Sequence, residues 1–112
     1  MNEVKIKVKD GILTASIACE IDHHTAKILR ERIDEALVKQ KPKELVLDFS
    51  SVGFMDSSGL GLITGRVELA ERVGASVCIA GLSSPLEKLL RLSGIERIEN
   101  LRICDKKQKI TG

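Results

Sequence analysis

The fold of this 112-residue chain is constrained most by two short apolar runs. Each run is followed by a segment in which apolar residues recur at helical spacing. The runs at 45–47 and 77–79 are apolar throughout, as expected for central strands that are covered on both faces. Apolar residues recur at helical spacing after each run and also before the first one. Because alternating strands and helices build a sheet of mainly parallel strands with helices packed against it, we expect an α/β domain.

The N-terminal residues predict a hairpin at one edge of this sheet. Residues 4–9 alternate between apolar side chains and lysines, which is the pattern of an edge strand with one face on the core. Asp10 and Gly11 can adopt the positive φ values of a tight turn, and the alternation resumes at 13–19. These two strands are therefore expected to pair antiparallel.

The C-terminal part of the chain predicts one more strand and then a tail. Residues 101–104 alternate again, whereas the lysine-rich residues 105–112 show no periodic pattern. Such polar segments bury too little apolar surface to fold, so we expect a flexible tail there. No repeat or linker divides the chain. We therefore predict a single domain over residues 1–112 with a mixed sheet of four or five strands.

Capping residues predict where three helices begin and end. Asp22 can accept a hydrogen bond from a free backbone N–H at the start of the first helix. The second helix is expected to begin near Ser57 and to stop before Gly74, which suits a left-handed cap position. For the third helix, Ser84 and Glu87 have the spacing of a capping box.

The composition weighs against several classes of partner. Lys and Arg number 18 against 16 Asp and Glu, and only two residues are aromatic, so neither charge nor base stacking favours direct nucleic-acid binding. No segment resembles a signal core or a membrane span. Cys19, Cys78 and Cys104 lack the spacing of a metal or redox motif and are expected to be reduced thiols. We therefore expect a cytoplasmic protein without a membrane partner.

The most informative stretch, residues 48–61, connects a central strand to a helix and contains two adjacent serines. Ser58 is expected at a helix start beyond the carboxyl end of a strand, where α/β folds present functional groups. A serine at this point can also be no more than a helix cap. With two serines, Ser57 can cap the helix or be held in the loop while Ser58 faces solvent and accepts a modification.

Glycines within the second predicted helix also need an explanation. Gly59 and Gly61 each cost about 1 kcal/mol relative to Ala inside a helix. Gly61 and Gly65 are four residues apart and share one helix face, so they leave a smooth strip against which a partner helix could lie. Close packing on the protein's own sheet is the alternative.

Catalytic and cofactor-binding roles fit the same residues poorly. A serine hydrolase needs a base and a glycine two residues before its nucleophile, but Asp56 stands there before Ser58. Thr64 replaces the third glycine of a dinucleotide fingerprint. His23 and His24 would point about 100° apart on a helix and could not readily share a metal ion. We therefore expect no enzymatic activity, no metal and no cofactor.

Three motifs carry a resemblance to a known family over nearly the whole chain. They are Leu-Val-Leu-Asp at 45–48, Phe-Met-Asp-Ser-Ser-Gly-Leu-Gly at 54–61 and Glu-Ile-Asp-His-His-Thr-Ala at 20–26. The chain resembles the STAS domain family and, within it, the anti-sigma factor antagonists of bacterial partner switching. The segment at 20–26 looks most like the sporulation members. The family commonly ends in an apolar-faced helix, a pattern that 105–112 lacks.

The resemblance implies a phosphorylation switch. Ser58 would be phosphorylated by an anti-sigma factor that is itself a serine kinase, and a PP2C-type phosphatase would reverse this. The unphosphorylated form would bind the anti-sigma factor and free the sigma factor, while ATP and magnesium would belong to the kinase. The alternative is a STAS module of a transporter or stress-signalling complex in which serine is not phosphorylated. The predicted partner-binding residues are Asp22, His23, Asp56, Ser57, Ser58, Gly59, Gly61 and Gly65.

Overall fold

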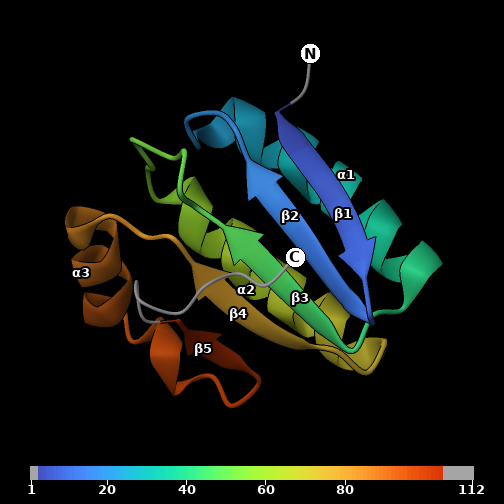
Figure 1. The fold of residues 1–112 in the computed structure, drawn as a ribbon. Coiled ribbons are helices and arrows are strands. Elements are labelled where there is room, and N and C mark those ends of the chain that lie inside the picture. The colour runs from blue at the N-terminus through green and yellow to red at the C-terminus, as the bar shows by residue number, and fades with distance from the viewer. Residues whose placement is uncertain (1–2, 105–112) are drawn as a thin grey trace.

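The computed structural model describes residues 3–104, which form a five-stranded sheet with the order β1-β2-β3-β4-β5 (Figure 1). The β1–β2 pair is antiparallel and the other pairs are parallel, which confirms the predicted mixed sheet of an α/β domain. The strands are β1 (Val4–Lys9), β2 (Ile12–Ile17), β3 (Glu44–Asp48), β4 (Ser76–Ala80) and β5 (Leu101–Ile103). The helices are α1 (His23–Gln40), α2 (Ser58–Arg72) and α3 (Ser84–Leu92), followed by the 3-10 turn η1 (Ile95–Arg97).

The hairpin turn and the start of the first helix, both predicted from the sequence, are confirmed by the structure. Asp10 and Gly11 have φ values of 52° and 80°, which is the left-handed backbone of the predicted hairpin turn. The Asp22 carboxylate accepts hydrogen bonds from the backbone N–H groups of His24 and Thr25 at 2.9 and 2.8 Å. The Thr25 hydroxyl accepts one in return from the Asp22 N–H, which completes a capping box at the start of α1.

The two faces of the sheet are covered differently. Helices α1 and α2 lie together on one face (Figure 1), where the main core includes Leu45 and Leu47 of β3. On the opposite face, Val46, Cys78 and Ala80 form a separate small cluster. Successive strand residues point to opposite faces of the sheet. The runs in β3 and β4 are therefore apolar throughout because one face packs against helices and the other contributes to this cluster.

The start of α3 differs from the expected one by one residue. Ser83, not Ser84, is the N-cap, and its hydroxyl accepts a 3.4 Å hydrogen bond from the Leu86 N–H. Ser83 has the extended backbone that a cap requires, with φ −69° and ψ 159°. Glu87 lies one position beyond the site at which a capping box needs its acidic residue, so the predicted Ser84–Glu87 box was wrong.

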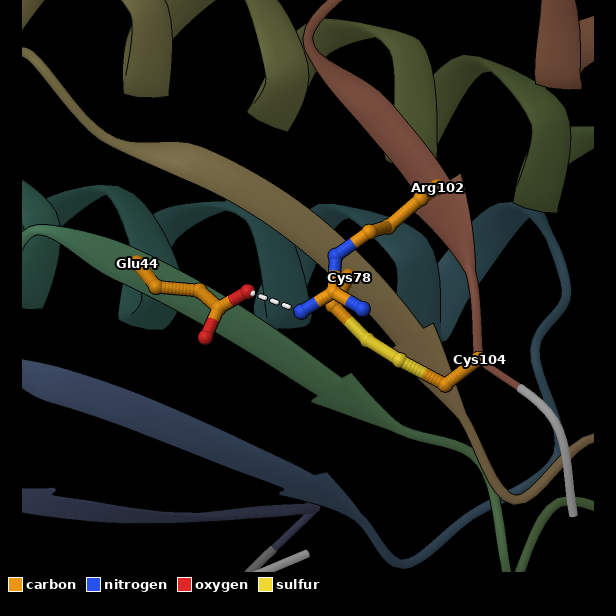
Figure 2. The surroundings of a disulfide bond; sticks show 4 residues. All are labelled: Glu44, Cys78, Arg102 and Cys104. Atoms are coloured by element: carbon orange, nitrogen blue, oxygen red, sulfur yellow. Dashed lines mark hydrogen bonds and ion pairs between the residues drawn. A yellow bond between two sulfur atoms is a disulfide. The ribbon is translucent and has the colours of Figure 1, made fainter. Parts of the chain in front are cut away.

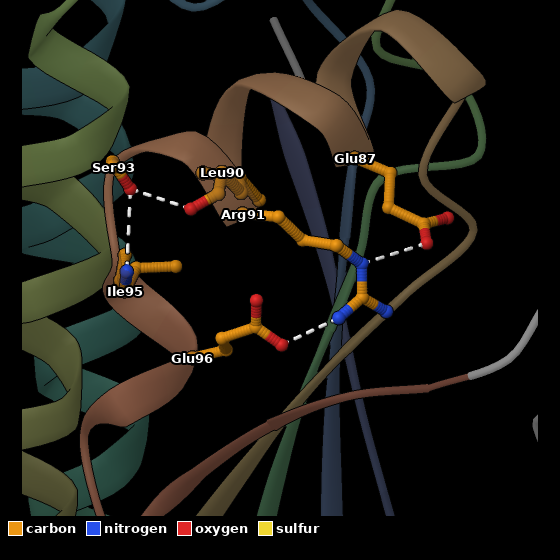
Figure 3. A network of polar contacts seen from close by, with 6 residues as sticks. All are labelled: Glu87, Leu90, Arg91, Ser93, Ile95 and Glu96. Carbon is orange, nitrogen blue, oxygen red and sulfur yellow. Dashed lines mark hydrogen bonds and ion pairs between the residues drawn. The ribbon is translucent and has the colours of Figure 1, made fainter.

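Glu87 instead joins a polar network that holds α3 against η1 (Figure 3). The Arg91 guanidinium binds the Glu87 carboxylate at 3.0 Å and also contacts Glu96 in η1. The Ser93 hydroxyl accepts a 3.3 Å hydrogen bond from the Ile95 N–H. Exposed ion pairs of this kind contribute little alone, so the turn is held mainly by the burial of Ile95.

A disulfide joins Cys78 in β4 to Cys104 just after β5 (Figure 2), which contradicts the expectation that all three cysteines are reduced. The two cysteines are 26 residues apart in sequence, but pairing of β4 with β5 brings their Cα atoms to 6.2 Å. Arg102 on the same face binds Glu44 at 2.8 Å. Cys19 is a free thiol, and burial raises its pKa.

Replacement of Cys104 by Ser is expected to lower the free energy of unfolding by about 2 to 3 kcal/mol in an oxidising buffer, because the bond restricts the unfolded chain. Denaturant titration of both proteins, with and without dithiothreitol, measures this loss. The variant and the parent should coincide once dithiothreitol is present, and Cys19→Ser should match the parent in both buffers. An equal loss under reducing conditions would instead assign the effect to packing of the Cys104 side chain.

No helix within residues 3–104 is long and apolar enough to cross a membrane. The flexible tail expected at 105–112 lies outside the described residues.

Candidate functional site

Backbone hydrogen bonds join the segment before α1 to the loop before α2. The Ile21 N–H donates to the Phe54 carbonyl and the Asp56 N–H donates to the Ile21 carbonyl, both at 3.0 Å. Ile21 and Met55 also form a parallel β-bridge between the two segments. This pairing brings the start of α1 beside Ser58, although the two lie far apart in the sequence.

Ser58 is the first residue of α2, and Asp56 rather than Ser57 supplies the side-chain bond at this helix start. The Asp56 carboxylate accepts a 2.8 Å hydrogen bond from the Ser58 backbone N–H. Ser57 occupies the N-cap position, but its side chain is exposed and makes no capping bond. Ser57 therefore does not cap the helix, contrary to one of the two roles considered for it.

A groove of about 580 Å³ lies between α1 and α2 beside Ser58. Of the predicted partner-binding residues, four line it: His23, Ser58, Gly61 and Gly65. Three others lie at or beside the same end of the groove without lining it: Asp22 and Asp56 bind backbone N–H groups at the starts of α1 and α2, and Ser57 is exposed next to Ser58. The structure thus brings most of the predicted surface together at one end of two adjacent helices.

The glycines of α2 fall into two kinds. A Cβ atom added to Gly59 would collide with the Met55 side chain, so this buried glycine permits close packing inside the domain. A Cβ on Gly61 or Gly65 would meet no atom of the described part of the chain within 4 Å. Packing on the protein's own sheet therefore does not explain Gly61 and Gly65, which instead leave open space in the groove. For Gly59, a partner contact stays a prediction.

Several residues that line the groove were not predicted from the sequence. They are His24, Ala26, Lys27, Arg30, Leu62 and Arg66. The sequence does contain a pattern that could have predicted two of them. On α1, Lys27 is four residues after His23, and Arg30 is three residues after Lys27. Residues at this spacing share one helix face. Their position relative to α2 could not be inferred from that spacing.

An ion pair between the buried Arg66 and the partly exposed Asp34 connects the two helices that form the groove. The Arg66 Nε lies 2.6 Å from the Asp34 Oδ1, and Arg66 is only 5% exposed. Burial lowers the pKa of Arg66 and raises that of Asp34, and their mutual attraction opposes both shifts. Because separating the two partners would leave the Arg66 charge buried and unpaired, the pair favours the observed packing of α1 against α2.

Within residues 3–104, no group of three or more His, Cys, Asp or Glu side chains is placed to hold a metal ion. His23 and His24 are both exposed at the first turn of α1. The Ser58 hydroxyl has no hydrogen-bond partner among the same residues.

The fold and the site together define a class of protein: a small mixed α/β domain in which a serine at a helix start opens onto a groove between two helices. The chain belongs to the STAS domain family, whose model matches residues 3–109. This confirms the family resemblance seen in the motifs.

Similar proteins include anti-sigma factor antagonists from several bacteria. The anti-sigma F factor antagonist of Paenibacillus polymyxa is 33% identical over 96 residues, covering 86% of this chain and 82% of that protein. The anti-sigma-B factor antagonist of Bacillus subtilis is 30% identical over 95 residues, covering 85% of each. Both similarities extend over most of the domain.

Solved structures show the same fold. The anti-sigma factor antagonist SpoIIAA in its unphosphorylated form superposes with a TM-score of 0.70 at 23% identity, covering 91% of this chain and 87% of that one. A putative anti-sigma factor antagonist from Thermotoga maritima reaches a TM-score of 0.79 at 21% identity, covering 93% and 88%. At these identities the likeness establishes the architecture.

Proposed function

We propose that this chain is an anti-sigma factor antagonist that is switched off by phosphorylation of Ser58. The observation that carries the proposal is the position of Ser58 at the first turn of α2, on the rim of a groove that Gly61 and Gly65 leave open. The relatives described as anti-sigma F and anti-sigma-B factor antagonists support the same class. The unphosphorylated chain binds an anti-sigma factor kinase, which then releases its sigma factor.

The kinase supplies the chemistry of the modification. The Ser58 oxygen bonds to the γ-phosphorus of ATP, the bond to ADP breaks, and a base of the kinase takes the hydroxyl proton. Magnesium and ATP are bound by the kinase, and a PP2C-type phosphatase restores the serine. The Ser58 hydroxyl has no hydrogen-bond partner within residues 3–104, which supports this role, because a hydrolytic serine would need a base positioned to activate it.

The phosphate acts on binding more than on folding. It would place nearly two negative charges beside the Asp56 carboxylate. The backbone N–H groups at the start of α2 compensate partly, by about 0.3 to 1 kcal/mol, so the domain should remain folded. A partner surface that fits a neutral hydroxyl would have to bury this charge, and every 1.4 kcal/mol of cost weakens binding about tenfold.

Titration of the purified chain with the anti-sigma factor kinase of the same genome, in the presence of adenine nucleotide, tests the proposal. We expect a stable complex and release of the bound sigma factor. We also expect no turnover of simple esters by the chain alone. Absence of a complex with any anti-sigma factor, or esterase activity that disappears in Ser58→Ala, would contradict the proposed function.

Incubation with the kinase and ATP is expected to place one phosphate on Ser58 and none on Ser57. The family resemblance selects the second serine, and Ser58 lines the groove whereas Ser57 does not. Mass spectrometry locates the phosphate, and Ser57→Ala should still accept it. A phosphate found on Ser57 would contradict the proposed switch.

Replacement of Gly61 by Leu is expected to weaken kinase binding at least about tenfold while the melting temperature stays equal or rises. The new side chain enters open space in the groove, and the helix gains because Leu is a better helix former than Gly by up to about 1 kcal/mol. Glu71→Leu is the matched control, since it adds the same side chain to an exposed position of α2 outside the groove. Unchanged binding together with a large loss of stability would contradict a partner role for Gly61.

A further inference from the structure

We propose that the groove between α1 and α2 receives an acidic helix of the anti-sigma factor. This inference rests on the proposed function and specifies which kind of partner segment occupies the site. Three features support it: the charge of the groove, its shape and the position of Ser58 at one end.

The groove is positive although the chain as a whole is nearly neutral. Among residues 3–104, none of those that line it is acidic. Lys27 and Arg30 are exposed along its α1 side, and neither forms an ion pair with a carboxylate within residues 3–104. Arg66 differs, because Asp34 already pairs with it; Asp34 also attracts Arg30 but forms no ion pair with it within residues 3–104. Two cations on one helix face are thus available to a partner, and carboxylates are the side chains that they attract.

The shape of the groove suits a helix. Gly61 and Gly65 are one helical turn apart, and at both a Cβ would have no neighbour within 4 Å among residues 3–104. Small residues at this spacing allow a second helix backbone to approach closely, and helices commonly bind in grooves between two others. Leu62, which is buried beside these glycines, supplies an apolar floor.

Two acidic residues of the protein itself, Asp22 and Asp56, lie near the Ser58 end of the groove, while Asp34 pairs with Arg66 farther along α1. Asp22 and Asp56 are both engaged by backbone N–H groups at the starts of α1 and α2. An acidic partner helix would therefore place its carboxylates toward Lys27 and Arg30. A phosphate on Ser58 adds negative charge to the groove that holds this helix, so repulsion accounts for the direction of the switch.

Charge reversal tests the inference. In the Lys27→Glu/Arg30→Glu double variant, kinase affinity should fall at least about tenfold at low salt, and its dependence on ionic strength should become shallower. The control is Lys5→Glu/Lys88→Glu, which changes net charge equally at exposed positions on β1 and α3 and should bind like the parent. Should the reversed protein fail to fold, Lys27→Gln/Arg30→Gln provides the same comparison with a smaller expected loss.

The outcomes separate this inference from the proposed function. If the parent binds the kinase and the groove variants bind it equally well or more tightly, the acidic-helix inference is wrong while the antagonist function stands. If the parent binds no anti-sigma factor, the proposed function is wrong and the inference falls with it. Weaker binding in both the groove variants and the control would also overturn it, because the effect would then come from net charge alone.

Discussion

Replacement of Ser58 by Asp is expected to weaken binding of the anti-sigma factor at least about a hundredfold while the domain remains folded. Ser58 lines the groove, so the new carboxylate lies where a partner must exclude water. Leaving a charge unpaired in such an interface costs about 3 kcal/mol or more, which corresponds to this loss of affinity. A negative charge at the first turn of α2 is compatible with the helix dipole, so the melting temperature should not fall.

Binding titrations and thermal unfolding of three proteins measure this effect. Ser58→Ala should bind like the parent, because the hydroxyl itself makes no hydrogen bond in residues 3–104. Ser57→Asp is the matched control, since it adds the same charge to the adjacent exposed serine. Equal losses in Ser57→Asp and Ser58→Asp would show that local charge, and not occupation of the groove by residue 58, prevents binding.

Gly81→Ala is expected to destabilise the domain by about 3 to 5 kcal/mol, the largest effect on stability expected here. Gly81 follows β4 with a φ of +74°, a conformation that costs an alanine about 1 to 2 kcal/mol. In addition, its Cβ would lie 2.8 Å from the Ser50 backbone nitrogen and 2.9 Å from the Asp48 Oδ1. Asp48 Oδ1 accepts hydrogen bonds from the Ser50 N–H and hydroxyl at 3.0 and 2.6 Å, so the methyl group would disrupt this turn.

Alanine variants of two other glycines, measured in denaturant titrations, distinguish the cost of the positive φ from the cost of the contact with Ser50 and Asp48. Gly74 also has a positive φ, +84°, but its Cβ would meet no atom of residues 3–104 within 4 Å, so Gly74→Ala should cost only the conformational part. Gly53 has neither constraint, and Gly53→Ala should be nearly neutral. Equal losses for Gly81→Ala and Gly74→Ala would show that the contact with Ser50 and Asp48 does not matter.

Much of this fold follows from short-range rules that can be applied to the sequence directly. The Asp10-Gly11 turn, the Asp22 cap and the apolar strands β3 and β4 were predicted correctly. Each depends on a side chain and its near neighbours along the chain. Where two neighbours were equally suited, this reasoning was less reliable: it named Ser84 as the cap of α3 where the structure has Ser83, and it left open whether Ser57 caps α2, where Asp56 makes the side-chain bond.

The remaining features depend on which residues that are far apart in the sequence lie close together in the fold. The sequence determined that Gly59, Gly61 and Gly65 lie in one helix, but only the tertiary structure distinguishes a glycine buried against Met55 from two that face open space. The Cys78–Cys104 pairing likewise depends on β4 and β5 lying side by side. Sequence periodicity describes one helix or strand at a time, whereas a groove or a disulfide depends on which second element packs beside it.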